Sequence, residues 1–394
     1  MSYKKLGNYI KLIDNRNRDL SDAPLLGVSV QKRFITSIAN TIGSDMSKYK
    51  LIEKNNFVYI ADTSRRGDKI GIALLKDFDK AMISQAYTCF KIIDENKLSP
   101  DYLMMWFSRP EFDRYARYHS IGSVREVFDW KDMCEVELPI PPIEEQRQIV
   151  AQYHSIANKI KVNEQICEKL EATAQALYKH WFVDFEFPYS PLSEGCPQDG
   201  VVIGQPYKSS GGKMVWNEEL GKEIPEGWEV GKLEDFVLIK NGKSKPIIGG
   251  NIPVYGGNGI IEFVNKNNYE RLNIIGRVGA YCGSVYYNDS KVWVSDNALA
   301  GISKNDTIYL DFLLLKSLNL NSKSEGSSHP LLTQGILNNI QVLKANNNLI
   351  YTNFEEIIKK LFEQIKNIID QNRKIAQLQN LLLSRLAVGE EVGA

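Results

Sequence analysis

The stretch PPIEEQRQIVAQYHSIANKIKVNEQICEKLEATAQALYKHWFVDFEFP, residues 141–188, decides the fold. Its two prolines suit the first turn of a helix, and the two glutamates that follow Ile143 complement the positive end of a helix dipole. Mostly apolar residues then recur at alternating spacings of four and three, which is the seam of a coiled coil. The seam consists of Ile149, Tyr153, Ile156, Ile160, Asn163, Cys167, Leu170, Ala174, Leu177 and Trp181.

A second run of the same kind extends from Phe354 to Leu386. A shift of 209 residues maps Ile149 onto Ile358 and Asn163 onto Asn372. A polar residue in an apolar seam costs stability and fixes register, so the shared asparagine indicates one helical element used twice. We therefore expect two long helices that pack antiparallel. The second seam reads Ile358, Phe362, Ile365, Ile369, Asn372, Ala376, Gln379, Leu383 and Leu386.

The stretches before the two runs also echo each other. Lys5-Leu6-Gly7-Asn8-Tyr9-Ile10 resembles Lys232-Leu233-Glu234-Asp235-Phe236-Val237. An internal repeat outranks local patterns when an architecture is inferred. We predict an α+β protein in which two mixed α/β globular blocks are separated by two long antiparallel coiled-coil helices, as an internal pseudo-repeat. The expected parts are a first block at 1–140, a central helix at 141–187, a linker at 188–222, a second block at 223–345 and a C-terminal helix at 346–394.

Within the blocks the local patterns are mixed. Strands are predicted at 57–60, 69–75, 273–275 and 284–287, and helices at 100–118 and 310–318. The prolines and glycines of 190–222 predict an irregular connection.

Charge is balanced overall but segregated along the chain. Lys plus Arg is 48 and Asp plus Glu is 48. The net charge is +6 over residues 1–120, −9 over 121–230, +3 over 231–350 and zero over 351–394. A neutral total argues against a polybasic chain that holds nucleic acid by bulk charge, whereas two mildly basic blocks are compatible with local contacts to phosphates.

Compartment and metal content follow from the cysteines and the hydropathy pattern. The five cysteines are odd in number, widely spaced and without a CxxC pair, so we expect neither a disulfide framework nor a structural zinc site. Residues 1–7 lack the apolar core of a signal peptide, and no stretch approaches the length of a membrane span. We expect a cytoplasmic protein with no membrane partner.

Motifs for catalysis are scarce. Gly242-Lys243-Ser244 lacks the upstream glycine of a phosphate loop, and no GxGxxG, HExxH or Asn-Pro-Pro-aromatic motif occurs. Pro100-Asp101 together with Asp129-Trp130-Lys131 fits a loose pattern for metal-dependent phosphodiester cleavage. Ser99 and Pro100, however, predict that Asp101 begins a helix. We therefore expect no catalytic and no metal-binding residues.

Features suited to nucleic acid are better represented. Lysine and arginine contact phosphates, arginine also reads guanine, and glycine-rich turns let the backbone approach a groove. The candidate DNA-binding residues of the first block are Lys32, Arg33, Arg65, Arg66, Arg114, Arg117, Ser123 and Arg125. Those of the second block are Lys243, Lys245, Tyr255, Asn258, Arg271, Arg277 and Tyr281. Two reading blocks on a stiff spacer would contact a split site on one duplex.

The chain resembles the specificity subunit of type I restriction–modification systems. Leu138-Pro139-Ile140-Pro141-Pro142-Ile143-Glu144-Glu145-Gln146 is similar to the start of that family's first long helix. Leu177-Tyr178-Lys179-His180-Trp181-Phe182 is similar to the end of that helix, and Ile224-Pro225-Glu226-Gly227-Trp228 to the start of its second target-recognition domain. The segments 252–256, 276–279 and 292–298 also resemble a common recognition-domain type.

The resemblance implies a subunit without catalytic activity, whose two blocks are target-recognition domains. Each domain would read one half of a bipartite double-stranded DNA site. The helices, through Ile149, Ile156, Ile160, Asn163, Leu170, Ile358, Ile365, Ile369, Asn372 and Leu386, would pair and dock two methyltransferase (modification) subunits. S-adenosylmethionine, ATP and Mg²⁺ would belong to those and to the restriction/translocase subunits, so no cofactor is expected on this chain.

Two alternatives belong to other classes. One is a nuclease or a restriction–modification fusion enzyme, and the other is a coiled-coil scaffold whose blocks bind proteins. Beside two blocks and two helices, 394 residues leave no room for a complete methyltransferase domain.

Overall fold

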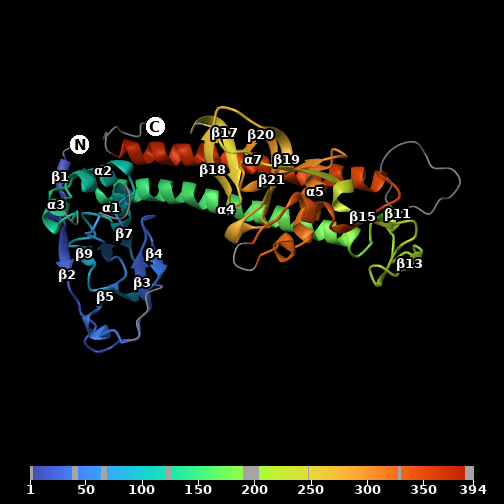
Figure 1. Ribbon diagram of the computed structural model, residues 1–394. Helices are drawn as coiled ribbons and strands as arrows, with labels where there is room; N and C mark the ends of the chain where they lie inside the picture. The colour runs from blue at the N-terminus through green and yellow to red at the C-terminus, as the bar shows by residue number, and fades with distance from the viewer. Residues whose placement is uncertain are drawn as a thin grey trace. The chain divides into compact units, whose positions relative to one another are not determined.

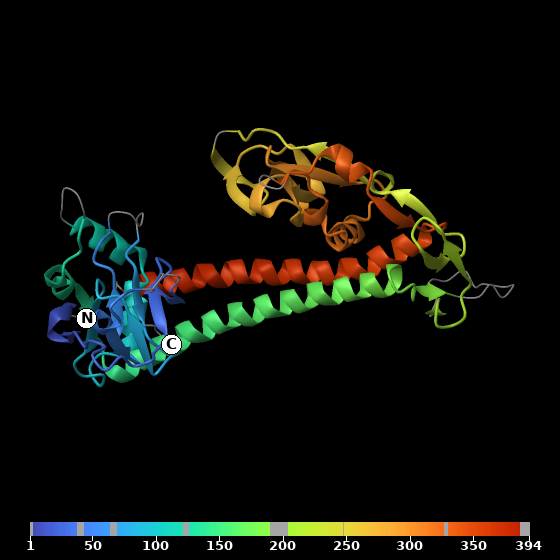
Figure 2. The same cartoon turned by 60° about the horizontal axis from the view of Figure 1, so that its bottom comes forward.

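The computed structural model describes residues 3–37, 43–63, 69–120, 126–189, 204–246, 248–326 and 330–386. It divides into two compact units, of which the first comprises Met1–Asn163 with Gln371–Ala394 and the second Glu164–Asp370. Two long helices, α4 (Ile143–Phe182) and α7 (Leu349–Arg385), contribute a segment to each unit (Figures 1 and 2).

The first unit contains two four-stranded sheets. One has the strand order β2-β9-β6-β7 and the other β4-β3-β8-β5, while β1 pairs with β10 immediately before α4. The elements are β1 (Tyr3–Lys5), η1 (Leu6–Asn8), β2 (Ile10–Ile13), β3 (Leu25–Val28), β4 (Phe34–Thr36), η2 (Met46–Lys48), β5 (Lys50–Glu53), β6 (Phe57–Tyr59), β7 (Ile72–Leu74), β8 (Lys80–Ile83), β9 (Thr88–Ile92), α1 (Pro100–Phe107), α2 (Pro110–Tyr118), α3 (Trp130–Glu135) and β10 (Glu137–Pro139).

Aromatic side chains form the centre of this unit. Phe57 and Phe90 stack with ring centroids 4.9 Å apart, and Phe107 of α1 meets both rings edge-on. The single helix expected over 100–118 is wrong, because the chain forms α1 and α2 with a break between them. Pro110 has no N–H to donate to a preceding turn, so it begins a helix rather than continuing one.

The second unit contains one six-stranded sheet and several small strand pairs. The sheet order is β16-β21-β19-β20-β17-β18, and β15 pairs with β22 shortly before α7. The elements are β11 (Pro188–Tyr189), β12 (Gln205–Pro206), β13 (Met214–Asn217), β14 (Lys222–Pro225), β15 (Glu229–Lys232), η3 (Leu233–Asp235), β16 (Val237–Asn241), β17 (Ile248–Gly256), β18 (Gly259–Val264), β19 (Tyr269–Gly276), η4 (Gly279–Tyr281), β20 (Val285–Val294), β21 (Ala298–Ser303), α5 (Ile308–Ser317), η5 (Leu320–Lys323), α6 (Gln334–Asn338) and β22 (Gln341–Lys344).

The connection expected to be irregular over 190–222 is partly regular. Strands β13 and β14 form an antiparallel hairpin, and β12 pairs with β11. Ile224 is buried on the inner face of the hairpin, where it joins the main core of the unit. The sequence did not predict this strand pairing, because the prolines and glycines of the segment indicate turns. Such residues do not exclude short strands between the turns.

The same pairing scheme occurs in both blocks. A short strand, a 3-10 turn and a second strand occur as β1, η1 and β2 in one and as β15, η3 and β16 in the other. Strand β2 pairs with β9, which pairs with β6, and strand β16 pairs with β21, which pairs with β19. Each block also has one parallel pair, β3 with β8 and β17 with β20.

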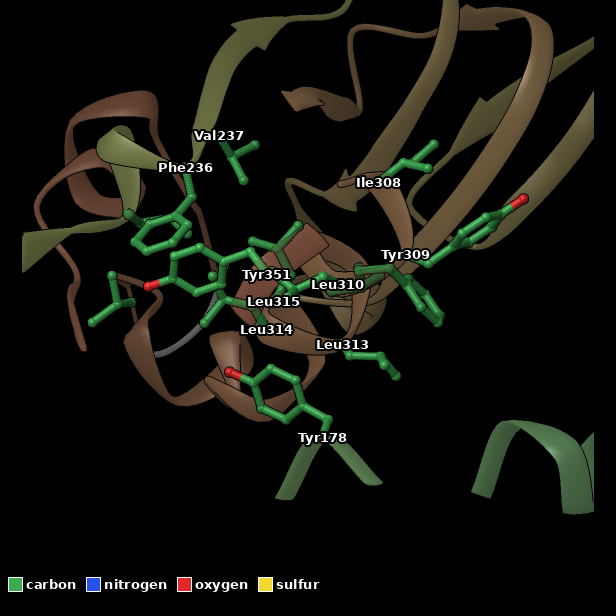
Figure 3. Packing of buried hydrophobic residues seen from close by; sticks show 14 of the residues in the cluster. Tyr178, Phe236, Val237, Ile308, Tyr309, Leu310, Leu313, Leu314, Leu315 and Tyr351 are labelled. Atoms are coloured by element: carbon green, nitrogen blue, oxygen red, sulfur yellow. The ribbon is translucent and has the colours of Figure 1, made fainter. Parts of the chain in front are cut away.

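Helices α4 and α7 run antiparallel in each unit. In the first unit, Leu383 and Leu386 pack in the cluster that contains Ile149 and Tyr153. In the second, the rings of Trp181 and Phe354 lie 5.2 Å apart. Tyr178 of α4 and Tyr351 of α7 also pack with residues of α5, such as Leu310 and Leu314, in one core (Figure 3).

Most of the predicted seam residues are buried or half-buried, and Phe362 packs on Tyr309 of α5. Asn163 is 2% exposed, and its Nδ2 donates to Oδ1 of Asn372 over 2.7 Å. Ile369 is an exception at 48% exposure, and the neighbouring Ile368 is half-buried instead. A strict 3.5-residue seam drifts relative to a 3.6-residue helix, which moves Ile369 off the contact. Ile149, Ile156, Ile160 and Leu170 are half-buried, while Ile358, Ile365 and Leu386 are buried.

Candidate nucleic-acid interface

The loops that follow β16, β17, β19 and β20 come together in the second block: residues 242–246, 257–258, 277–281 and 295–297. We call this the loop end of the second block. The backbone holds these loops together, because Lys243 N–H donates to the carbonyl of Val294 (3.0 Å) and Arg277 N–H to that of Asn297 (3.1 Å). Glycine permits the close approach, since a Cβ on Gly242 would lie 1.8 Å from the carbonyl oxygen of Ser295.

Several predicted residues come together at this loop end. Lys243, Asn258 and Tyr281 are exposed, and Tyr281 reaches 51% exposure. Arg277 is half-buried, and none of the described residues accepts a hydrogen bond from its Nε. The side chains of these loops therefore include two cations (Lys243 and Arg277), an amide (Asn258) and an aromatic ring (Tyr281). Cationic and amide groups of this kind contact the phosphates and base edges of a DNA groove.

Three other predicted residues of the second block lie elsewhere or are engaged. Tyr255 is 9% exposed in the sheet core, where burial raises the pKa of its hydroxyl. Arg271 is at the opposite end of β19 from Arg277 and forms an ion pair with Asp306. Lys245 forms an ion pair with Glu262 over 2.6 Å, with its side chain still 51% exposed.

The predicted residues of the first block are less concentrated. Lys32 forms a 2.7 Å ion pair with Asp113 in which both side chains are only 9% exposed, and burial lowers the pKa of this lysine. Arg33, Arg114 and Arg117 are exposed, and Arg114 pairs with Glu111 one helical turn away. Arg65, Arg66, Ser123 and Arg125 lie outside the described residues.

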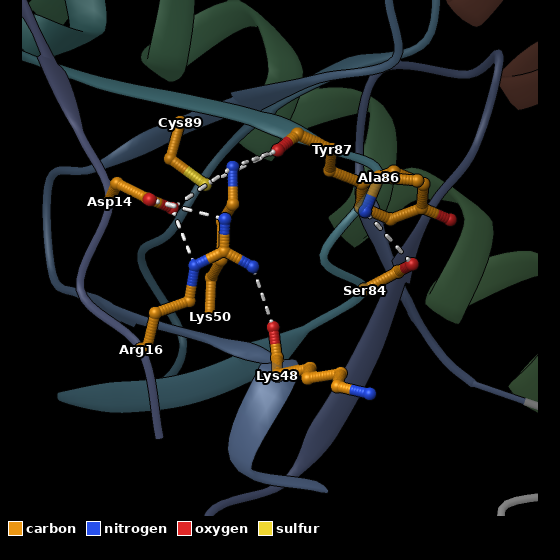
Figure 4. A network of polar contacts seen from close by, with 8 residues as sticks. All are labelled: Asp14, Arg16, Lys48, Lys50, Ser84, Ala86, Tyr87 and Cys89. Atoms are coloured by element: carbon orange, nitrogen blue, oxygen red, sulfur yellow. Dashed lines mark hydrogen bonds and ion pairs between the residues drawn. The ribbon is translucent and has the colours of Figure 1, made fainter. Parts of the chain in front are cut away.

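A polar network in the first block contains cations that the sequence interpretation missed (Figure 4). Arg16 follows β2 and holds Asp14 through two nitrogens, at 2.9 and 3.1 Å, while its third nitrogen donates to the carbonyl of Lys48 over 2.8 Å. Lys50 donates to the carbonyl of Tyr87 over 2.8 Å and lies 3.4 Å from Asp14. Strand β2 ends beside the start of β9 as β16 ends beside the start of β21, so Arg16 corresponds in position to the loop 242–246 of the second block.

The network carries surplus positive charge in a fixed arrangement. Partial burial raises the pKa of Asp14, but the hydrogen bond from Arg16 and the charges of Lys50 and Arg16 outweigh it and leave that pKa below its ordinary value. The single carboxylate of Asp14 thus orients both Arg16 and Lys50 and neutralises one of their two charges. Lys48 pairs with Asp45 over 3.4 Å, and its side chain is 63% exposed. When Lys5-Leu6 is aligned with Lys232-Leu233, Arg16 aligns with Lys243. This repeat is the sequence signal that could have identified Arg16 as a candidate.

The acids of the cleavage-like pattern have structural roles. Ser99 caps α1, and Asp101 in its first turn pairs with Lys76 over 2.8 Å. Asp129 caps α3 by accepting from Lys131 N–H over 2.9 Å. Throughout the described ranges, no group of three or more acidic, histidine or cysteine side chains is placed to hold a metal ion. In the same ranges no helix has the length and apolar content to cross a bilayer.

Comparison with known proteins gives a consistent result. A family model described as the type I restriction modification DNA specificity domain matches residues 10–172 and again 225–375. The type I restriction enzyme MjaIX specificity subunit of Methanocaldococcus jannaschii is 27% identical over 76% of this chain and 71% of its own length. The HindI specificity subunit of Haemophilus influenzae is 23% identical over 86% of this chain and 87% of its own length.

A solved structure has the same fold. The S subunit of a type I restriction–modification system from M. genitalium matches with a TM-score of 0.52, over 98% of this chain and 96% of that chain. The two sequences are 16% identical, so this match concerns the fold alone.

Proposed function

The chain belongs to the type I restriction–modification specificity family, and on that premise we propose that it reads a bipartite DNA sequence, one half-site with each block. Specificity subunits are non-catalytic components of type I systems. The chain would thus contribute recognition, while methylation and cleavage take place on other subunits.

The observation that carries the proposal is the repeated scheme of the two blocks. Both place a cation directly after the first strand of the same pairing, Arg16 after β2 and Lys243 after β16. The family model matches twice, once over each block and the helix that follows. A pseudo-repeat with two equivalent reading surfaces accounts for both facts.

The helices suit a spacer between two readers. Helix α4 has 40 residues and α7 has 37, which correspond to about 55–60 Å at ~1.5 Å per residue. One turn of B-DNA is about 34 Å, so an antiparallel coiled coil of this length would separate two short half-sites by an unread gap. The Asn163–Asn372 hydrogen bond would fix its register.

Partners follow from the same proposal. Two modification subunits would dock on the helices and supply S-adenosylmethionine, and restriction/translocase subunits would supply ATP and Mg²⁺ chemistry. The complex would act in the cytoplasm, where its DNA is. Since the chain has no net charge, its affinity for DNA alone should be weak and salt-sensitive and should rise on assembly.

The test is selection of duplexes from a split-site library by the assembled complex, with the isolated chain in parallel. We expect one bipartite motif from the complex. Arg16→Ala and Lys243→Ala should weaken binding about equally on all sequences and reduce the salt dependence, because each removes a phosphate contact. Lys359→Ala, an exposed position on α7, is the matched control. A complex without sequence preference would favour the scaffold alternative instead.

A further inference from the structure

One face of α7 holds the second block through a set of different contacts. The carboxylate of Glu355 accepts hydrogen bonds from the backbone N–H groups of Tyr309 (3.1 Å) and Leu310 (2.8 Å), in the first turn of α5. Phe362 stacks on the ring of Tyr309 with centroids 4.5 Å apart, and Lys366 pairs with Asp289 over 2.7 Å. Spacings of seven and four place these α7 residues on one helix face.

Stability alone does not explain a glutamate at position 355. Glu355 is 8% exposed, and burial raises the pKa of its carboxyl group. A buried carboxylate loses its hydration, and well-packed apolar residues often stabilise such a position at least as well. A carboxylate instead fixes the orientation of α5 on α7. Its two oxygens can accept from two N–H groups of a helix start in one orientation only.

A side-chain hydrogen bond connects this helix start to β19, the strand that leads to the loop end of the second block. The side chain of Asn273, which is fully buried in β19, donates to the carbonyl of Ile308 at the beginning of α5 over 3.1 Å. Strand β19 continues to Gly276, and Arg277 follows at the loop end. Glu355 on α7 is thus linked through α5 and β19 to the loops that carry the candidate readers.

We propose that Glu355 is a positioning residue that sets the orientation of the second block's loop end on α7, and so the gap length at which a split site is accepted. The inference rests on the proposed reading of a bipartite site. Adding one base pair to the gap moves a half-site by about 3.4 Å and rotates it by about 35°, since a turn of ~34 Å holds about 10–10.5 base pairs. Only a rigidly held reader can reject that displacement.

The experiment uses the assembled complex on duplexes that share the selected half-sites and differ in gap length. The wild-type complex should prefer one gap over gaps one base pair shorter or longer by about tenfold or more, as for a mismatched base. Glu355→Gln keeps the shape but replaces one acceptor with a donor that faces N–H groups. It should reduce the gap preference to about threefold or less, while preferences for the bases of each half-site stay unchanged.

The control is Glu356→Gln, which changes the exposed neighbour on the same helix and should keep the wild-type gap preference. If Glu355→Gln does not fold, Lys366→Ala decides instead, compared with the exposed Lys360→Ala, and only Lys366→Ala should widen the accepted gaps. Weaker binding by an equal factor at every gap would overturn the inference. A wild-type complex that selects no split site would overturn the proposed function instead.

Discussion

We predict that Asp311 makes the stability of the second unit dependent on pH. This residue of α5 is fully buried, its Oδ1 accepts from the hydroxyl of Thr307 over 3.4 Å, and none of the described residues donates to its Oδ2. Burial raises the pKa of its carboxyl group from 3.8 to about 7. The folded state therefore binds the proton more tightly, and the stability that protonation provides is complete below pH 3.8 and lost as the pH rises through 7.

Asp311→Asn removes this loss, because the amide has nearly the same shape and no charge. Each unit of pKa difference corresponds to about 1.4 kcal/mol, so at pH 8 the variant should be more stable than wild type by about 4 kcal/mol. The advantage should be less than half of that at pH 5 and vanish below about pH 4. Urea unfolding followed by circular dichroism across this range measures it.

Glu356→Gln serves as the control, since that side chain is exposed. The reasoning is refuted if the difference between Asp311→Asn and wild type is the same at pH 5 and pH 8, or if the variant is the less stable of the two at pH 8.

Two further predictions concern the seam and the loop end. Asn163→Leu leaves the amide of Asn372 without its 2.7 Å partner, a loss of about 1–3 kcal/mol that the new apolar burial offsets by about 1.5–3 kcal/mol. Stability should therefore change little while the oligomeric profile in size-exclusion chromatography changes; an unchanged profile with an altered recognition sequence would contradict this. Gly242→Ala should destabilise the chain by about 1–3 kcal/mol and weaken DNA binding, because its Cβ would meet the Ser295 carbonyl at 1.8 Å. Gly335→Ala, with room for a Cβ in helix α6, should leave both properties near wild type, and equal thermal shifts in the two variants would count against the close approach.

The sequence predicted the helices well because their signal is local and repeated. An apolar residue every three or four positions is visible without knowledge of the partner. In the structure, the two asparagines that the seams share form a direct hydrogen bond. The exact positions of the seam residues on α7 were predicted less accurately. Ile369 fits a strict heptad but is 48% exposed, since small drifts of a helix are not recorded in residue spacing.

Side-chain roles in the blocks were harder to predict, because contacts distant in sequence decide them. From the sequence, Lys32 was predicted to be a cation available for DNA. In the structure it forms an ion pair with Asp113 of α2. Tyr255 looks like a stacking ring but lies inside the sheet core. Arg16 carries no motif, and its position becomes meaningful only when β2 pairs with β9. A composition of cations and glycines indicated the kind of surface, whereas strand pairing determined which residues form it.

The central claim is that each block reads one half of a split site. The most direct measurement is sequencing of methylated DNA from cells that express the complete system, with the wild-type chain and with residues 1–138 replaced by those of a relative. We expect one bipartite motif for wild type and a change in one half-site only for the chimera. A change in both half-sites, or in neither, would contradict it.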